Sequence, residues 1–180
     1  MDKQFVSQHV SQQPSAEHAA DDRAIRNLVG QFEQGWNAAD GAACGRPFSE
    51  NADFTAVNGL RARGRDVIGK GHAEILATVF RGTKLHATVN SIEYLRPDVA
   101  VVDVTMHLTP AGQTWLPKYT SCGIIAVKDS GNTDSEWSIA VFRNMVPFDR
   151  PIAGPLDRQL LDRSAQTRQW ASEGSKDAGR

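Results

Sequence analysis

His72 is the residue of this sequence best suited to proton transfer. In DVIGKGHAEILATVF (residues 66–80) the spacing of Ile68, His72, Ile75 and Val79 predicts one apolar stripe of a helix. Burial lowers the pKa of an imidazole and keeps it neutral, so His72 could abstract a proton or bond a ligand. The alternative is a packed core histidine that is satisfied by one hydrogen bond.

Asn144 and Asp53 are the polar residues that could assist. The amide of Asn144, near the end of WSIAVFRN, could donate to an enolate-like oxygen or could cap the sheet edge. Strand alternation puts Arg143 on the opposite face, so only one of the two points into a cavity unless a bulge intervenes. Asp53 could be a general base whose pKa is raised by poor hydration, or a strand-start residue bonded to backbone amides.

A polar row is expected on one face of a hairpin whose tip is Arg96 and Pro97. His86, His107 and the carboxylate of Asp103 on this face could ligate zinc. We favour a solvated face and predict no metal. Asp103 in this row, or Asp53, could instead orient His72 or share the proton transfer with it. Beyond Asn90 the alternation slips, which predicts a bulge near Asn90–Ser91. The pairs expected to lie opposite each other are His86–His107, Thr88–Thr105 and Asn90–Asp103.

Aromatic residues could line an apolar ligand pocket, although such residues more often fill a core. Cys44 and Cys122 match no metal-ligand spacing and are predicted to be free thiols, with Cys122 a small buried strand residue and not a nucleophile. Besides Arg143, the candidate substrate-binding residues are Phe32, Trp36, Trp115, Tyr119 and Phe142.

These residues need a scaffold in which helices come first and strands follow. A helix is predicted from Asp21 or Asp22, as its cap, to the WNAADG segment, with an apolar stripe of Ile25, Leu28, Val29, Phe32 and Trp36. A short strand, a hairpin, the helix of residues 65–80 and four strands joined by turns come next. This order predicts an α+β fold with a mostly antiparallel sheet over residues 21–147. Residues 1–20 are predicted to be a mobile arm, and residues 148–180 a partly helical or disordered extension.

Composition narrows the function classes. The 180 residues are 40% hydrophobic with a formal net charge of −1, and the scattered basic residues argue against nucleic acid. No stretch is long and apolar enough to predict a membrane span. The absence of a phosphate-binding loop predicts no nucleotide, flavin or nicotinamide cofactor. The polar start of the chain predicts a cytoplasmic protein.

The order of the motifs resembles the nuclear transport factor 2-like superfamily, also called SnoaL-like, and within it the branch named after SgcJ and EcaC. The resemblance covers residues 21–147 and implies a cone in which a curved mixed sheet wraps around N-terminal helices. The matching segments are WNAAD (36–40), NADFTAVNG (51–59) with GRDVIGKGH (64–72), RPDVAVVD (96–103) and WSIAVFRN (137–144).

The resemblance also implies a small hydrophobic ligand in the cone and a homodimer. Relatives include ketosteroid isomerase, scytalone dehydratase and polyketide cyclases, alongside pure binding modules. The chain departs from the ketosteroid isomerase type because Ala56 occupies the expected place of the catalytic aspartate. The resulting hypothesis is a cofactor-independent enzyme of natural-product biosynthesis, of polyketide or enediyne type, which catalyses isomerisation, cyclisation or dehydration. The alternative is a non-catalytic ligand-binding or dimerising accessory protein.

Overall fold

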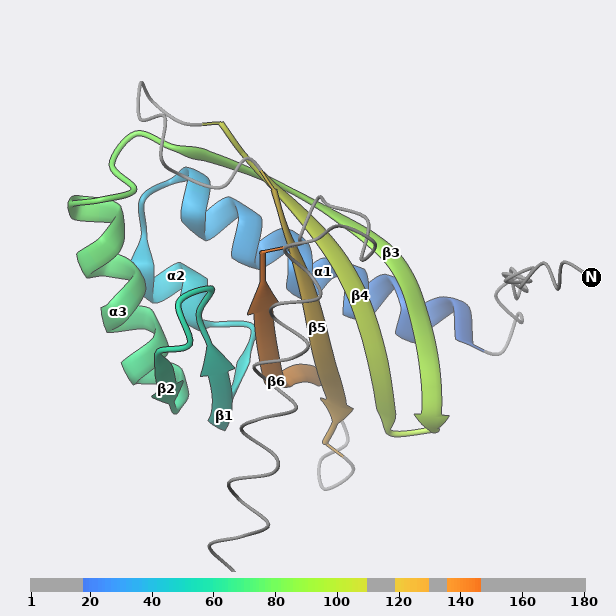
Figure 1. The fold of residues 1–180 in the computed structure, drawn as a ribbon. Helices are drawn as coiled ribbons and strands as arrows, with labels where there is room; N and C mark the ends of the chain where they lie inside the picture. The colour runs from blue at the N-terminus through green and yellow to red at the C-terminus, as the bar shows by residue number, and fades with distance from the viewer. Residues whose placement is uncertain (1–17, 110–118, 130–135, 147–180) are drawn as a thin grey trace, which may run out of the picture. The chain divides into compact units, whose positions relative to one another are not determined.

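The chain forms helices and strands in the order expected from the sequence (Figure 1). The computed structural model describes residues 18–109, 119–129 and 136–146. The predicted N-terminal arm and C-terminal extension therefore lie almost wholly outside the described residues. The elements are α1 (Ala19–Asn37), α2 (Gly41–Gly45), β1 (Phe48–Thr55), β2 (Arg61–Arg63), α3 (Arg65–Ala77), β3 (Lys84–Arg96), β4 (Val99–Thr109), β5 (Tyr119–Lys128) and β6 (Trp137–Met145).

The strands form one sheet in the order β2-β1-β6-β5-β4-β3. All neighbours run antiparallel except β1 and β6, which are parallel. In Figure 1 the long strands β3 and β4 bend along their length, α1 lies across one face, and α3 lies beside the short β1–β2 hairpin. The predicted fold class, α+β with a curved, mostly antiparallel sheet around N-terminal helices, is confirmed.

The β3–β4 hairpin contains the predicted bulge. Its pairing register shifts between Val89 and Ser91, which leaves Asn90 without a partner in the register. Ser91, and not Asn90 as predicted, therefore lies opposite Asp103 and donates its hydroxyl to that carboxylate at 3.0 Å. A bulge of this kind bends the strand and increases its local twist. The expected pairs that the structure confirms are His86–His107 and Thr88–Thr105.

Helix α1 packs its apolar stripe into the core. It begins at Ala19, ahead of both predicted capping residues, so neither Asp21 nor Asp22 is its cap. The Asp21 carboxylate instead accepts hydrogen bonds from Lys128 Nζ and Trp137 Nε1, both at 2.8 Å, which ties the first turn to the sheet. The buried stripe consists of the five predicted residues, Ile25, Leu28, Val29, Phe32 and Trp36, together with Gly35.

Polar side chains of α1 hydrogen-bond with the outer edge of β3, the last strand of the sheet. The Asn37 amide donates to the carbonyl of Leu85 and accepts from its N–H, both at 2.8 Å. The Asn37 side chain therefore forms the pair of hydrogen bonds that the backbone of a neighbouring strand would form. Along the same edge Glu33 accepts from the N–H of Ala87 at 2.9 Å, and Arg26 donates to the carbonyl of Val89 at 3.3 Å.

Helices α2 and α3 pack backbone against backbone. A Cβ atom added to Gly41 would lie 2.3 Å from the backbone nitrogen of Ala73, far inside van der Waals contact. Only glycine allows this approach. The Asp40 side chain caps α2 by accepting from the N–H of Ala43 at 2.9 Å. The position of α3 is therefore set by a small-residue contact.

Helix α3 buries His72 and Ile68, as the stripe predicted, but it is shorter than predicted. It ends at Ala77, so Val79 lies beyond the helix and is 41% exposed. Ile75 is half-buried. The predicted stripe is correct over its first three members and wrong at Val79.

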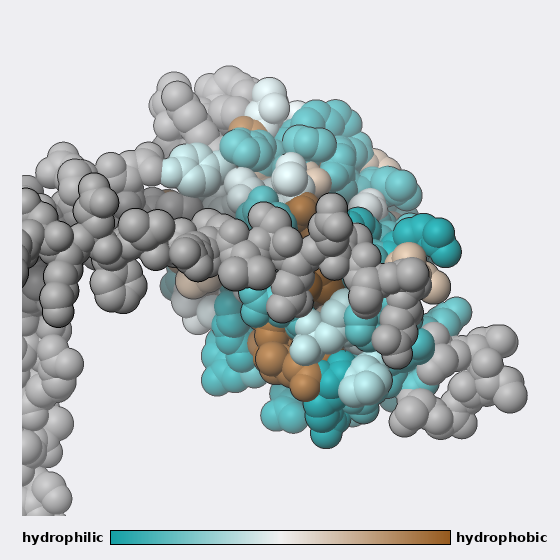
Figure 2. Space-filling model, turned by 90° about the vertical axis from the view of Figure 1, so that its right-hand side faces the viewer, coloured by the Kyte–Doolittle hydropathy of each residue, from teal (hydrophilic) through white to brown (hydrophobic). Residues whose placement is uncertain are grey.

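The surface in Figure 2 is mostly hydrophilic, with hydrophobic residues visible in a few places among the described residues. Seven large hydrophobic residues are exposed in the described ranges, and three of them (Val57, Leu60 and Val67) reappear below at the mouth of a cavity. Among the described helices, none is long and apolar enough to cross a membrane.

Candidate functional site

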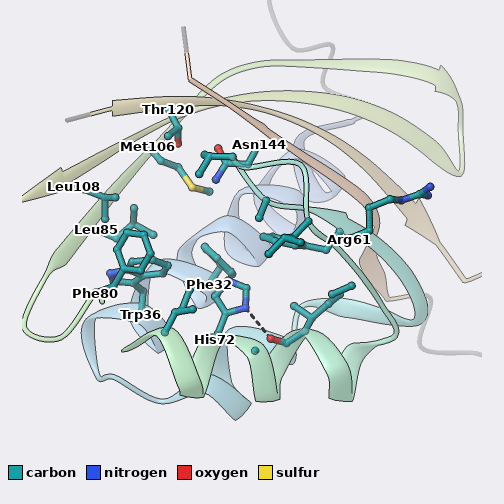
Figure 3. A pocket seen from close by; sticks show the side chains of 18 of the residues that line it. Phe32, Trp36, Arg61, His72, Phe80, Leu85, Met106, Leu108, Thr120 and Asn144 are labelled. Atoms are coloured by element: carbon teal, nitrogen blue, oxygen red, sulfur yellow. Dashed lines mark hydrogen bonds between the residues drawn. The ribbon is translucent and has the colours of Figure 1, made fainter. Parts of the chain in front are cut away.

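A cavity of about 200 Å³ lies between α3 and the inner face of the sheet (Figure 3). This volume is below the roughly 300–1,000 Å³ of pockets for drug-sized ligands, so the cavity suits a compact molecule. Val57, Leu60 and Val67 lie at the exposed part of its lining. Aromatic and aliphatic side chains make up most of the wall, among them Phe32, Trp36, Phe54, Phe80, Leu85 and Met106.

His72 is a buried titratable residue in this wall, with only 5% of its surface exposed. Its Nδ1 lies 2.8 Å from the carbonyl oxygen of Ile68. A carbonyl only accepts, so Nδ1 carries the proton and the neutral ring leaves a lone pair on Nε2. Among the described residues no protein group hydrogen-bonds to Nε2. His72 therefore offers the cavity a proton acceptor in a fixed tautomer.

Three aromatic rings hold the imidazole in place. Phe32 and Phe54 each contact it edge-to-face with ring centroids 5.2 Å apart, and Trp36 does so at 6.1 Å. Burial lowers the pKa of His72 below its ordinary value, and the hydrogen bond to Ile68 opposes that shift in part. The ring is therefore neutral near pH 7, as the sequence predicted.

Asn144 lines the opposite wall of the cavity, and Arg143 does not. In Figure 3 His72 rises from α3 while Asn144 and Thr120 come from the sheet on the other side. This agrees with the expected placement of the two residues on opposite faces, and the bulge that the sequence leaves open is present, because the β5–β6 register shifts between Ile125 and Ala126. Trp137 and Ile139 are buried before the shift and Phe142 after it, so the face changes parity within the strand.

Asp53 does not line the cavity, and the predicted raised pKa is wrong. Its carboxylate pairs with the guanidinium groups of Arg61 and Arg143, the latter at 3.2 Å. Hydrogen bonding from Arg61, with further help from Arg143, lowers the pKa of Asp53 below its ordinary value. Arg143, predicted to bind substrate, also donates to the Asp53 carbonyl at 2.9 Å. The pair holds the β1–β2 hairpin against β6.

The remaining predicted site residues lie in the core, on the outer face of the sheet, at the cavity wall or outside the described residues. Asp103 is exposed on the outer face beside Ser91, away from His72. Phe142 is fully buried and stacks on Phe54 at 4.9 Å, within the core. Tyr119 is half-buried, 6.0 Å from the ring of His107. Trp115 lies outside the described residues, and Phe32 and Trp36 line the cavity.

Two of the lining residues that sequence reasoning missed bear on the chemistry of the site. Ala56, noted only as a departure from the ketosteroid isomerase type, is itself a lining residue, so no acid faces the cavity from this position. Thr120 is 3% exposed and lines the cavity, next to Cys122 on β5. Its position follows from the alternation of β5, in which even-numbered residues are buried. Within the described ranges, no group of three or more His, Cys, Asp or Glu side chains is placed to hold a metal ion.

Comparison with known proteins identifies the fold. No protein-family model matches the chain, and no curated protein matches it. A domain of unknown function with a cystatin-like fold from Nostoc punctiforme is 25% identical, with a TM-score of 0.66 over 89% of this chain and 99% of that one.

Two further solved structures share the fold at lower identity. A candidate scytalone dehydratase from Novosphingobium aromaticivorans is 19% identical, with a TM-score of 0.57 over 77% of this chain and 97% of that one. An NTF-2 like protein of unknown function from Shewanella oneidensis is also 19% identical, with a TM-score of 0.58 over 69% of this chain and 98% of that one. The chain therefore has a cystatin-like fold, which the NTF-2 like protein shares.

Proposed function

We propose that this protein is a cofactor-independent enzyme that binds a small apolar molecule in the cavity and transfers a proton on it. The observation that carries the proposal is the buried His72, whose ring lines an apolar cavity on the wall opposite Asn144 and whose Nε2 has no hydrogen-bond partner among the described residues. Isomerisation, cyclisation and dehydration all need a base and a group that stabilises the oxyanion. The candidate scytalone dehydratase with the same fold is consistent with this chemistry.

The proposed roles follow from the two walls. His72 Nε2 takes a proton from carbon or oxygen of the ligand, and the carbonyl of Ile68 stabilises the resulting imidazolium through Nδ1–H. The amide nitrogen of Asn144 donates to the oxygen on which negative charge develops. The apolar wall excludes water and strengthens both interactions. Asp53, Asp103 and Arg143 have no part in this scheme.

We also propose that the protein acts in natural-product biosynthesis and belongs to the branch named after SgcJ and EcaC. The support is the place of the resembling segments in the fold. GRDVIGKGH ends at His72 in α3, and WSIAVFRN ends at Asn144 in β6, so both carry the residues of the cavity. The proposed substrate class is a compact polyketide-like intermediate with an enolisable carbonyl group.

A deuterium-exchange assay tests the proposal without knowledge of the natural substrate. The ketone 1-tetralone is incubated with the protein in D2O, and loss of the proton signal beside the carbonyl is followed by NMR. We expect exchange above the buffer rate and a loss of at least about a hundredfold in His72→Ala. His86→Ala, on the exposed outer face, is the matched control and should exchange like the wild type. Exchange within threefold of the wild type in a folded His72→Ala would refute the role of His72.

The second candidate function is a non-catalytic binding module. Ala56 favours it, because this lining position carries no acid. Such a module would bind 1-tetralone without accelerating its exchange, so the same experiment separates the two functions when binding is measured alongside.

We further propose a homodimer that forms through the outer face of the sheet. Val99 lies opposite Val127, and Val101 lies opposite Ile125, and all four are half-buried on that face. A second copy on this face would cover a patch of β-branched residues at low entropic cost. Sedimentation equilibrium of the wild type should give twice the chain mass, and Val101→Lys should give the monomer. A monomeric wild type would refute this proposal.

A further inference from the structure

A chain of three hydrogen-bonding side chains forms the sheet wall of the cavity. Cys122 on β5 lies opposite Asn144 on β6, and its Sγ is 3.2 Å from the Oδ1 of that amide. On the other side Sγ is 3.8 Å from the hydroxyl oxygen of Thr120, which lies two residues earlier on the same face of β5. Thr120 and Asn144 line the cavity, whereas Cys122 lies behind them.

The direction of this chain follows from the number of hydrogens available. The amide Oδ1 only accepts, so the single thiol hydrogen of Cys122 points to Asn144. The hydroxyl of Thr120 is then the donor to Sγ. With Oδ1 bonded to the thiol, the amide nitrogen carries both its hydrogens on the other side. Among the described residues no protein acceptor bonds this nitrogen.

The thiol keeps its hydrogen over the whole physiological range of pH. Cys122 is 1% exposed, and burial raises its pKa to about 12. A structural cysteine that is buried in this way is chemically inert, because the thiolate is the reactive form. A thiol in this position is therefore a permanent donor and a poor nucleophile.

We propose that Cys122 is a positioning residue that holds the amide of Asn144 with its NH2 group toward the cavity, so that the sheet wall recognises a carbonyl oxygen. This inference rests on the proposed function and narrows its substrate class. The ligand presents an acceptor oxygen to β6 and a transferable proton to His72 on α3. An inverted amide would present its oxygen and would select a hydroxyl donor instead.

A pair of ligands that differ only in the carbonyl tests the proposal. The affinities of 1-tetralone and its hydrocarbon counterpart tetralin are measured for the wild type, Cys122→Ser and Cys122→Ala. One hydrogen bond to the ketone corresponds to about a two- to tenfold preference over the hydrocarbon in the wild type. Cys122→Ala should lose most of this preference, and Cys122→Ser, which keeps a donor, should restore it. The carbonyl stretching frequency of bound 1-tetralone should be lower in the wild type and in Cys122→Ser than in Cys122→Ala.

Two controls separate orientation from packing. Cys44→Ala removes another fully buried thiol that does not line the cavity, and it should keep the preference of the wild type. Once Asn144→Leu has removed the amide, adding Cys122→Ala should change ketone affinity no further, because Cys122 acts through Asn144. An undiminished ketone preference in Cys122→Ala would overturn the positioning role alone. A wild type with no preference for the ketone would overturn the proposed site as well.

Discussion

The Nδ1 atom of His72 and the carbonyl oxygen of Ile68, one helical turn earlier, lie 2.8 Å apart within α3. This bond fixes both the tautomer and the rotation of the ring through the backbone of its own helix. The usual orienting partner of a catalytic histidine is a carboxylate, which stabilises the imidazolium by charge. A carbonyl orients the ring but supplies only a dipole. The site is therefore suited to an easily removed proton, such as one beside a carbonyl.

Stability should depend on pH through His72. Burial lowers its pKa in the folded protein, whereas the unfolded chain keeps the ordinary value near 6.5. Below about pH 6.5 the unfolded chain binds the extra proton, so this contribution to stability is fully present above that pH. It is lost as the pH falls toward the folded pKa. The free energy of unfolding in urea should thus fall more steeply from pH 7.5 to 5 in the wild type than in His72→Leu.

A buried apolar residue that does not titrate provides the control for that experiment. Ile124→Val should keep the pH dependence of the wild type. If the free energy of unfolding fell equally with pH in the wild type and in His72→Leu, the pKa of His72 would be unshifted in the folded protein.

Two glycine-to-alanine substitutions should have opposite effects. Gly41→Ala forces α2 and α3 apart, since its Cβ would lie 2.3 Å from a backbone nitrogen, and should cost about 1–3 kcal/mol or more. Gly30→Ala, in the middle of α1 with no atom within 4 Å of the new Cβ, should stabilise by about 0.4–1 kcal/mol. Urea denaturation measures both. If Gly41→Ala left the free energy of unfolding unchanged, α2 and α3 would be free to move apart.

Asn37 should stabilise the attachment of α1 to β3. Asn37→Ala removes two 2.8 Å hydrogen bonds and leaves backbone groups of Leu85 without their partner, which should cost about 1–3 kcal/mol. Gln34→Ala, at an exposed position of the same helix, should stay within about 0.5 kcal/mol of the wild type. Hydrogen exchange at the amide of Leu85 should accelerate in Asn37→Ala only, and unchanged protection there would contradict this role.

Asp53 should matter for stability and not for proton transfer. The Arg61 guanidinium, assisted by Arg143, lowers its pKa, so its contribution is present above an unfolded pKa of about 3.9. It is lost as the pH falls through the lower folded value. Asp53→Asn should lower the melting temperature at pH 7, by an amount that shrinks in acid, and should leave ketone exchange within threefold of the wild type. Asp103→Asn is the control, and a large loss of exchange in Asp53→Asn would restore it as a catalytic candidate.

The fold could be predicted because its determinants are local. The five-residue stripe of α1, the hairpin register and the bulge near Asn90 all follow from hydrophobic spacing along a short stretch of chain. The end of α3 could not be predicted, because Val79 fits the helical period and no nearby residue marks the last turn of the helix. The parallel pairing of β1 with β6 joins segments about ninety residues apart and leaves no trace in either pattern.

The candidate site was predictable only in part, for the same reason. His72 lies on a helix whose buried stripe is visible in the sequence, whereas for Asn144 only the strand itself is visible. Asp53 was misjudged because its pKa depends on Arg61 and Arg143, and the second of these lies on a distant strand. The bulge of β6 decided which of Arg143 and Asn144 faces the cavity, and a bulge without glycine or proline is invisible to alternation.

The bonds from Arg26, Glu33 and Asn37 to β3 have a consequence for association between molecules. An open strand edge is a template on which another chain can add a strand, the first step toward amyloid-like aggregates. Here four backbone groups of one edge, between Leu85 and Val89, already form hydrogen bonds with α1. The other end, β2, is three residues long and carries Arg61 and Arg63. Detachment of α1 would therefore expose an edge of β3 with which another chain can pair. Variants such as Asn37→Ala should aggregate while their hydrophobic core is still folded.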